Sequence, residues 1–200
     1  MKRIDISRGL FSTPVYPGDP QPRRDRIRRM DLGDSFNLSG FYCCCHSATH
    51  MDAPLHFMED GLSVDRVELF RCMGPCTVVA AAGTVTGADV DRLLPGAEKR
   101  ILFKGNGAAF LSRSAAFALA QGGVLLVGTD APSIAPADDE SGPHTELLAA
   151  GIPILEGLDL SAAEPGNYTL TALPLLLEGA EASPVRAVLT RAAPARNDQR

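Results

Sequence analysis

The sequence predicts an α/β protein with a mixed central sheet flanked by short helices. Short strand patterns alternate with short helical patterns along the chain, as expected for sheet-and-helix layers. Residues 123–128 are entirely apolar or glycine, as in a strand covered on both faces. The 200 residues suit one domain, and 45% apolar with 22% charged residues is an ordinary globular balance. No internal repeat and no linker divides the chain, so we expect one domain over residues 1–191.

The first part of the chain is predicted to contribute strands. Residues 3–7 form a short strand pattern, and residues 16–20 form a turn with Pro and Gly at its bends. Five arginines lie between Arg23 and Arg29, which is typical of an exposed edge strand whose charge opposes aggregation. A dimer contact or an anion site is the alternative for this segment. Residues 35–45 are expected to form a strand that runs into a histidine-rich segment.

The chain contains five cysteines, an odd number that argues against a disulfide framework. Three of them are consecutive and end the predicted strand over residues 35–45: Cys43, Cys44 and Cys45. We interpret these three as small apolar residues of a buried strand rather than as thiolate ligands.

The helices are predicted from start and stop signals. Ser63 is a plausible N-cap for a short helix to about residue 70, Thr86 or Thr84 starts a second helix over residues 89–94, and Ser112 caps a third to residue 119. A fourth short helix is expected from His144 to Ala150. Further strands are predicted over residues 76–81, 100–104, 123–128, 152–156, 168–177 and 185–190, and the tail over residues 192–200 is expected to be disordered.

Charge and hydropathy exclude several classes of partner. The net charge is −5 and the pI is about 5.3, so a nucleic-acid partner is not expected. No apolar run reaches the roughly 18 residues of a membrane span, and the N-terminus lacks the apolar region of a signal peptide. We therefore expect a soluble cytoplasmic protein with a small-molecule substrate.

The densest chemical signal is the segment His46-Ser-Ala-Thr-His50-Met-Asp52-Ala-Pro-Leu-His56. Imidazole is the commonest neutral metal ligand near neutral pH, and a carboxylate can bridge two cations. The helical H-E-x-x-H metal motif is excluded, because serine follows His46 and the proline two residues after Asp52 disfavours a helix. In an extended chain, His50 and Asp52 point to the same side.

Counting donors favours a catalytic metal site over a structural one. His46, His50 and Asp52, together with the distant His144 and Glu156, give five nitrogen and oxygen donors, and His56 is a sixth polar group. A closed structural zinc site needs four ligands and favours cysteine, whereas this set suits a binuclear or open site. Asp52 is then the natural bridge, and His56 suits a general base or proton shuttle. Spacing alone leaves open whether His144 and Glu156 join the cluster.

The histidine segment resembles the H-x-G-T-H-x-D-x-P-x-H signature of the cyclase family, which includes bacterial arylformamidases and isatin hydrolases. Further resemblances follow in the same order along nearly the whole chain, at residues 16–19, 128–133, 144–148, 154–158, 172–175 and 183–188.

The resemblance implies a swivelling β/β/α domain, commonly dimeric, with two divalent cations, zinc or manganese. It implies that His46, His50 and Asp52 bind one metal and that Asp52 bridges to a second metal held by His144 and Glu156. His56 becomes the proton-transfer residue. The implied reaction is hydrolysis of an amide C–N bond, foremost that of N-formylkynurenine to kynurenine and formate in tryptophan catabolism.

The aromatic residues that flank the histidine segment are candidates for substrate contacts, although ordinary packing is the alternative: Phe41, Tyr42 and Phe57. Two departures from the family pattern affect the substrate. Ala48 replaces the signature glycine, and Ala135 stands where an aspartate often precedes proline. A cyclic amide, as in isatin, or another amide or lactone is therefore an alternative substrate. A metal-binding protein without catalysis is the alternative from a different class.

Overall fold

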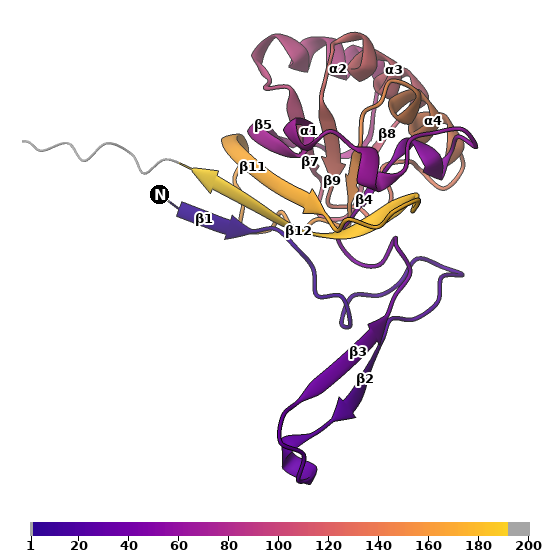
Figure 1. The fold of residues 1–200 in the computed structure, drawn as a ribbon. Helices are drawn as coiled ribbons and strands as arrows, with labels where there is room; N and C mark the ends of the chain where they lie inside the picture. Colours follow the sequence, from indigo (N-terminus) through magenta and orange to yellow (C-terminus); the bar gives the residue numbers. More distant parts are fainter. Residues whose placement is uncertain (1, 192–200) are drawn as a thin grey trace, which may run out of the picture.

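Eight strands form one mixed sheet that closes on itself in the computed structural model, which describes residues 2–191 (Figure 1). The strand order is β1-β12-β11-β5-β7-β9-β10-β4, and β4 also pairs with β12. The predicted α/β class with a mixed sheet is thus confirmed. The closure of the sheet into a ring was not predicted. The strands are β1 (Lys2–Asp5), β4 (His50–Asp52), β5 (Met73–Ala80), β7 (Arg100–Lys104), β9 (Leu126–Thr129), β10 (Ile154–Glu156), β11 (Gly166–Pro174) and β12 (Ala182–Arg191).

The closure depends on one long strand, β12. One edge of β12 pairs antiparallel with β11, and the other edge pairs with β1 near its end and with β4 near its start. Backbone hydrogen bonds from Ile6 to Ala187 and from Val185 to Thr49 fill the interval between these two pairings. On the far side of the ring, β5, β7, β9 and β10 run parallel, as strands connected through helices do.

Alternation along the parallel strands gives the protein two apolar clusters. Leu102 and Leu126 point into the ring, where they pack with residues of β5, β11 and β12. Their neighbours Ile101 and Val127 point outward and pack beneath the helices. These strands are buried on both faces, which explains their continuous apolar sequences.

Three helices cover the outer face of the parallel strands: α2 (Gly87–Leu93), α3 (Arg113–Gln121) and α4 (Ser141–Ala149). The predicted caps at Thr86 and Ser112 are confirmed, since each side-chain oxygen accepts a backbone N–H of the first turn. Ser63 caps nothing and donates to Asp65 instead. The predicted helix there is a 3₁₀ turn, η3 (Val64–Arg66), followed by α1 (Leu69–Cys72). The other short elements are η1 (Met30–Leu32), η2 (Pro54–His56), η4 (Leu94–Gly96) and the two-stranded sheet of β6 (Gly83–Val85) and β8 (Ala109–Leu111).

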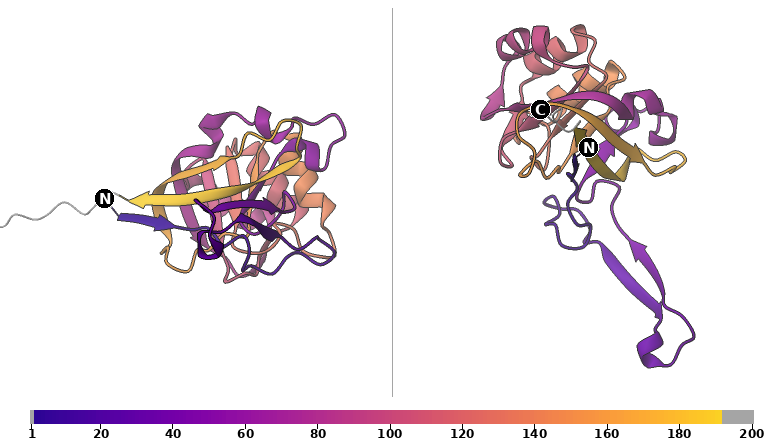
Figure 2. Two further views of the ribbon diagram at one scale, coloured as in Figure 1. Left: turned by 60° about the horizontal axis from the view of Figure 1, so that its bottom comes forward. Right: turned by 90° about the vertical axis from the view of Figure 1, so that its left-hand side faces the viewer.

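A long hairpin projects from the body of the protein (Figures 1 and 2). It consists of β2 (Arg23–Arg28) and β3 (Leu38–Tyr42) with their connection, and we call residues 23–42 the arm. Every side chain of β2 is exposed, which confirms the predicted exposed arginine-rich strand, and no residue of the arm is buried.

The cysteine interpretation is wrong in its placement. Cys43, Cys44 and Cys45 follow β3 in a turn rather than a buried strand, and all three are half-buried free thiols. The strand ends early because Tyr42 is the last residue that pairs with β2, so the cysteines lie where the chain leaves the arm and enters the body. The tail predicted over residues 192–200 lies outside the described residues. None of the helices within residues 2–191 has the length and hydropathy of a membrane span.

Candidate metal centre

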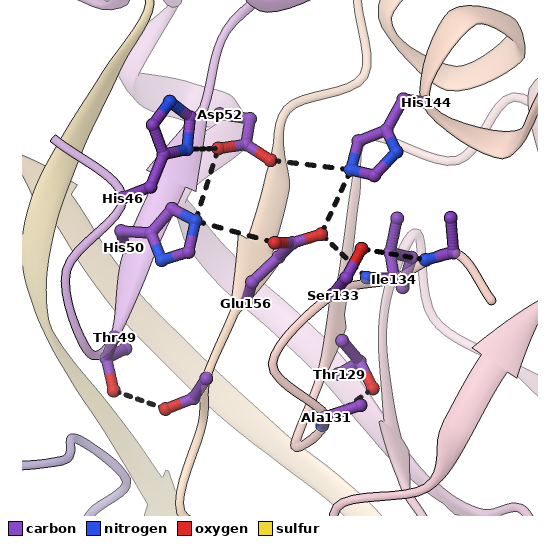
Figure 3. A network of polar contacts seen from close by, with 12 residues as sticks. His46, Thr49, His50, Asp52, Thr129, Ala131, Ser133, Ile134, His144 and Glu156 are labelled. Atoms are coloured by element: carbon purple, nitrogen blue, oxygen red, sulfur yellow. Dashed lines mark hydrogen bonds and ion pairs between the residues drawn. The ribbon is translucent and has the colours of Figure 1, made fainter. Parts of the chain in front are cut away.

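The pairing of β4 with β10 creates the site. His50 lies opposite Glu156 and Asp52 opposite Ile154 in the antiparallel register. Met51 and Leu155 point into the ring, so His50, Asp52 and Glu156 point outward on the same side of the sheet. There they lie beneath α4, whose fourth residue is His144 (Figure 3). The fold therefore joins the two parts of the chain that spacing could not connect.

The donor atoms converge within a few ångströms. Asp52 Oδ1 lies 3.0 Å from His46 Nδ1 and 3.4 Å from His50 Nε2, and His50 Nε2 lies 3.4 Å from Glu156 Oε2. His144 Nε2 lies 3.1 Å from Glu156 Oε1 and 3.9 Å from Asp52 Oδ2. Except for the His144–Glu156 contact, none of these approaches has the geometry of a hydrogen bond.

Backbone carbonyls orient two of the imidazoles. His50 Nδ1 lies 3.1 Å from the carbonyl oxygen of Ala48, and His144 Nδ1 lies 2.6 Å from that of Glu140. Each Nδ1 is then the N–H donor, which leaves Nε2 with its lone pair facing the carboxylates. Backbone carbonyls often fix metal-binding histidines in this way.

A divalent cation fits this set of residues because the site has buried polar atoms without partners. Among the described residues 2–191, both carboxylate oxygens of Asp52 and Nε2 of His50 and His46 are buried and accept or donate no hydrogen bond. Buried polar atoms are almost always paired in native proteins. A cation that accepts these lone pairs supplies the missing interaction.

The imidazoles and carboxylates of the cluster shift one another's pKa values. Burial opposes the protonated form of His50, but the carboxylates of Asp52 and Glu156 outweigh it and raise the pKa of His50 well above its usual value. Burial is likewise outweighed at His144, where the Glu156 carboxylate raises the pKa to about 9. Burial would raise the pKa of Asp52, but His50 and His46 hold it well below its usual value. A cation bound to these side chains would therefore compete with protons.

His56 stands beside the cluster and differs from the other histidines. Burial lowers its pKa, so its imidazole is neutral at neutral pH. Its ring lies 4.2 Å from that of His46 between centroids. Two groups of donor atoms lie within 4.8 Å of one another: His46, Asp52 and His56, and His50, Asp52 and Glu156. Asp52 belongs to both groups, and His56 is near enough to the other donors that a role as a ligand is an alternative to a role as a base.

Two adjoining cavities open onto the histidines. The first has a volume of about 280 Å³ and contains the cluster together with Tyr16, Asp19, Ser133 and Glu140. The second has a volume of about 240 Å³, and its lining includes His46, His50, Ala48 and Arg8. Tyr16 lines both cavities, and burial followed by the nearby Glu140 raises the pKa of its phenol. The combined space is that of a small-molecule site.

Ala48 occupies a conformation that favours glycine. Its φ is +58°, in the left-handed region, where an L-residue costs on the order of 1 kcal/mol. Glycine adopts this conformation without that cost, which explains the glycine of the family signature. Ala48 also lines the second cavity.

The three aromatic candidates lie in different places. Phe57 stacks on His144, with ring centroids 4.5 Å apart and planes at 14°, and thus packs against one imidazole of the cluster rather than lining a cavity. Phe41 and Tyr42 are exposed on the arm and line neither cavity. For these two, substrate contact stays a prediction that the single chain does not test.

Sequence reasoning overlooked several residues of the site. Glu181 Oε1 lies 3.4 Å from His46 Nε2, on the side opposite Asp52, and its backbone is fixed by the Ala53 N–H. Arg8 reaches the second cavity from the loop after β1, and Ser133 and Glu140 reach the first cavity from the loop between β9 and α4. Isolated polar residues in loops carry no spacing signal, although the turn after Tyr16 was visible in the sequence.

The chain belongs to the cyclase family, whose model matches residues 4–136. It is 40% identical to the kynurenine formamidase of Salinibacter ruber over 94% of this chain and 97% of that protein. A structure from Bacillus stearothermophilus described as a predicted metal-dependent hydrolase is 31% identical, with a TM-score of 0.80 over 94% of this chain and 97% of that one. Isatin hydrolase A from Labrenzia aggregata shares the fold, with a TM-score of 0.81 at 19% identity over 94% and 93% of the chains.

Proposed function

We propose that this protein is a metal-dependent amidohydrolase that cleaves the formyl C–N bond of N-formylkynurenine to give kynurenine and formate. The observation that carries the proposal is the cluster of imidazoles and carboxylates at the β4–β10 pairing, which borders two cavities. The similarity to a kynurenine formamidase over nearly the full length of both chains supports the substrate.

The residues that would hold metal are His46, His50, Asp52, His144 and Glu156, with Asp52 shared between two cations. Imidazole and carboxylate donors suit zinc and manganese alike. When bound, divalent cations in such a site polarise a carbonyl oxygen and make water more acidic.

The remaining chemistry falls to side chains of the first cavity. His56 is neutral and borders the cavity, so it can accept a proton from the attacking water. As the C–N bond breaks, His56 returns this proton to the departing aniline nitrogen, and the carbon leaves as formate. The contacts of Phe57 with both His56 and His144 restrict the positions of these two rings.

The direct test is hydrolysis by metal-replete enzyme whose metal content has been measured. We expect turnover of N-formylkynurenine, with kcat/KM far above that for isatin or for plain formanilide. If isatin is opened and N-formylkynurenine is not cleaved, the amide substrate is a cyclic one and the proposed substrate is wrong. A metal-replete protein that hydrolyses none of these compounds contradicts the reaction class.

Substitution of His56 separates a base from a ligand. His56→Asn should lower kcat by about 10²- to 10⁴-fold, the usual contribution of a general acid–base group, while metal content stays as in the wild type. The measurement is kcat together with metal per chain by elemental analysis. Glu59→Gln, at an exposed position three residues away, is the control and should change neither. Loss of metal in the His56 variant would instead assign His56 to the ligands.

We also propose that the protein is a homodimer in which the arm packs on a second copy. A lone two-stranded hairpin is at best marginally stable in water, yet the arm exposes Ile27, Met30, Leu32, Phe36 and Leu38. Residues 23–34 contain five arginines and three aspartates and so have a net charge of +2. Because the whole chain has a net charge of −5, the other residues together have −7. The arm and the body are thus complementary in charge. The body also exposes apolar side chains on α1 and the neighbouring end of β11, namely Leu69, Phe70 and Leu173.

The arm can be tested without touching the site. The double variant Ile27→Lys with Leu38→Lys should turn a dimer into a monomer, because lysine cannot be buried unpaired at an apolar interface. The measurement is molar mass by light scattering during gel filtration. Phe117→Lys, an equally exposed apolar position on α3, is the control and should remain dimeric. A wild-type protein that is monomeric at micromolar concentration would contradict the dimer.

A further inference from the structure

Arg8 is the one lysine or arginine among the described residues that line the second cavity. The same cavity is lined by His46, His50, Ala48 and Gly157. The backbone N–H of Arg8 donates to Thr49 Oγ1 at 2.9 Å, which fixes the start of this arginine next to the ligand segment. A molecule whose reacting amide lies at the histidines can therefore extend toward Arg8.

Backbone groups, rather than an acid, hold the Arg8 guanidinium in place. Its Nε donates to the carbonyl of Leu158 and one terminal nitrogen donates to the carbonyl of Asp130, both at 3.1 Å. Within residues 2–191, Arg8 forms no ion pair at 4 Å or less. The pKa of Asp159 is lowered, mainly by hydrogen bonds from Ser161 and further by the positive charge of Arg8. A guanidinium fixed through two donors and left without an anion has further N–H groups for a carboxylate.

The buried carboxylate of Asp130, which also lines this cavity, already has hydrogen-bond partners. Both oxygens of Asp130 accept backbone N–H groups of Gly105, Asn106 and Gly107 at 2.9–3.1 Å. Asp130 thereby fixes the loop that forms the far wall and is not free to neutralise Arg8 or to bind an ammonium group. Of the two charged side chains, Arg8 is therefore the one with hydrogen-bonding groups left over for a ligand.

We infer that Arg8 determines substrate specificity by binding the carboxylate of the amino-acid side chain of the substrate. This assignment rests on the proposed function and deepens it, because N-formylkynurenine has a reacting formamide at one end and an α-carboxylate at the other. The structure then explains a preference among formanilides: the formamide reacts at the histidines, the aromatic ring lies along the wall at Ala48 and Gly157, and the carboxylate pairs with Arg8.

The test compares substrates that differ only in the carboxylate. In Arg8→Gln we expect kcat/KM for N-formylkynurenine to fall about 10- to 100-fold, mainly through KM, as the loss of a charge-assisted hydrogen bond predicts. The decarboxylated analogue should be hydrolysed at the wild-type rate within twofold. Arg8→Lys, which keeps the charge, should restore part of the loss, and Arg92→Gln on the exposed face of α2 serves as the control. Equal losses on both substrates would mean that Arg8 only supports the loop, and would overturn the inference.

Binding distinguishes failure of this inference from failure of the proposed function. Calorimetry of kynurenine and of kynuramine, its decarboxylated counterpart, needs no turnover. The wild type should bind kynurenine at least tenfold more tightly, and Arg8→Gln should abolish that difference. If N-formylkynurenine is not hydrolysed but this difference is seen, the reaction is wrong and the role of Arg8 stands. If kynurenine binds no more tightly than kynuramine, the role of Arg8 is refuted whatever the reaction.

Discussion

Replacing Asp52 with asparagine is expected to remove bound metal and to lower kcat/KM by about 10³-fold or more. Asp52 is completely buried, and its two oxygens lie between His46 and His50 on one side and His144 on the other. The amide keeps the shape of the side chain but loses the negative charge and one of the two acceptor oxygens. Changes to groups that only orient a ligand typically cost 10- to 100-fold, so loss of a shared ligand should cost more. Metal per chain after dialysis and kcat/KM are the measurements.

The matched control is a second buried aspartate, Asp130, which lines the second cavity. Asp130→Asn changes a carboxylate whose oxygens accept backbone N–H groups rather than facing histidines. It should weaken the loop at residues 105–107 and lower the melting temperature, yet leave the metal content unchanged. If Asp52→Asn kept its full metal content while Asp130→Asn lost it, the proposed ligand set would be wrong.

The largest effect on stability is expected at Gly157. A Cβ at this position would lie 2.3 Å from the carbonyl oxygen of Ala48, and the φ of Gly157 is +62°. Gly157→Ala must therefore displace backbone as well as adopt a strained conformation, which together cost about 3 kcal/mol of unfolding free energy. Chemical denaturation of the metal-free protein measures this loss. The same carbonyl accepts the His50 N–H, so metal affinity should fall in parallel by about 10-fold or more.

Gly151→Ala isolates the two contributions. Gly151 has nearly the same backbone conformation, with φ of +68°, but its Cβ would meet nothing closer than a terminal nitrogen of Arg71 at 4.0 Å. This variant should lose only about 1 kcal/mol and should bind metal normally. Equal losses in the two variants would show that the contact of Gly157 with Ala48 has no energetic importance.

Local signals account for the parts of the fold that the sequence predicted. Thr86 and Ser112 start helices through their own side chains, within three residues of the groups they cap. The strand at residues 100–104 is apolar on both faces because helices and ring interior cover it, and that composition is visible without the fold. The exposed arginine strand was likewise recognisable, since it has no apolar face to bury.

Long-range pairing accounts for what the sequence did not predict. β4 has three residues, and its partners in β10 and β12 lie more than 100 positions away in the sequence. A local sequence pattern therefore does not predict the closure of the sheet. A run of small apolar thiols has the same composition in a turn as in a buried strand, which is why Cys43–Cys45 were misplaced. In the site, three histidines and an aspartate in eleven residues were conspicuous, whereas Glu181 and Arg8 acquire meaning only from their neighbours.

The three residues of β4 link catalysis to the integrity of the ring. β4 bonds to β10 along one edge and to β12 along the other, so it is the final segment that makes the sheet continuous. Its side chains His50 and Asp52 face Glu156 of β10, and a cation shared among them would join the two strands a second time. Ligands that bind only the native state stabilise it in proportion to their occupancy. Metal depletion should thus first weaken the pairing of β4 with β10 and β12. Amide hydrogen exchange should become faster in β4, while β7 and β9 stay protected.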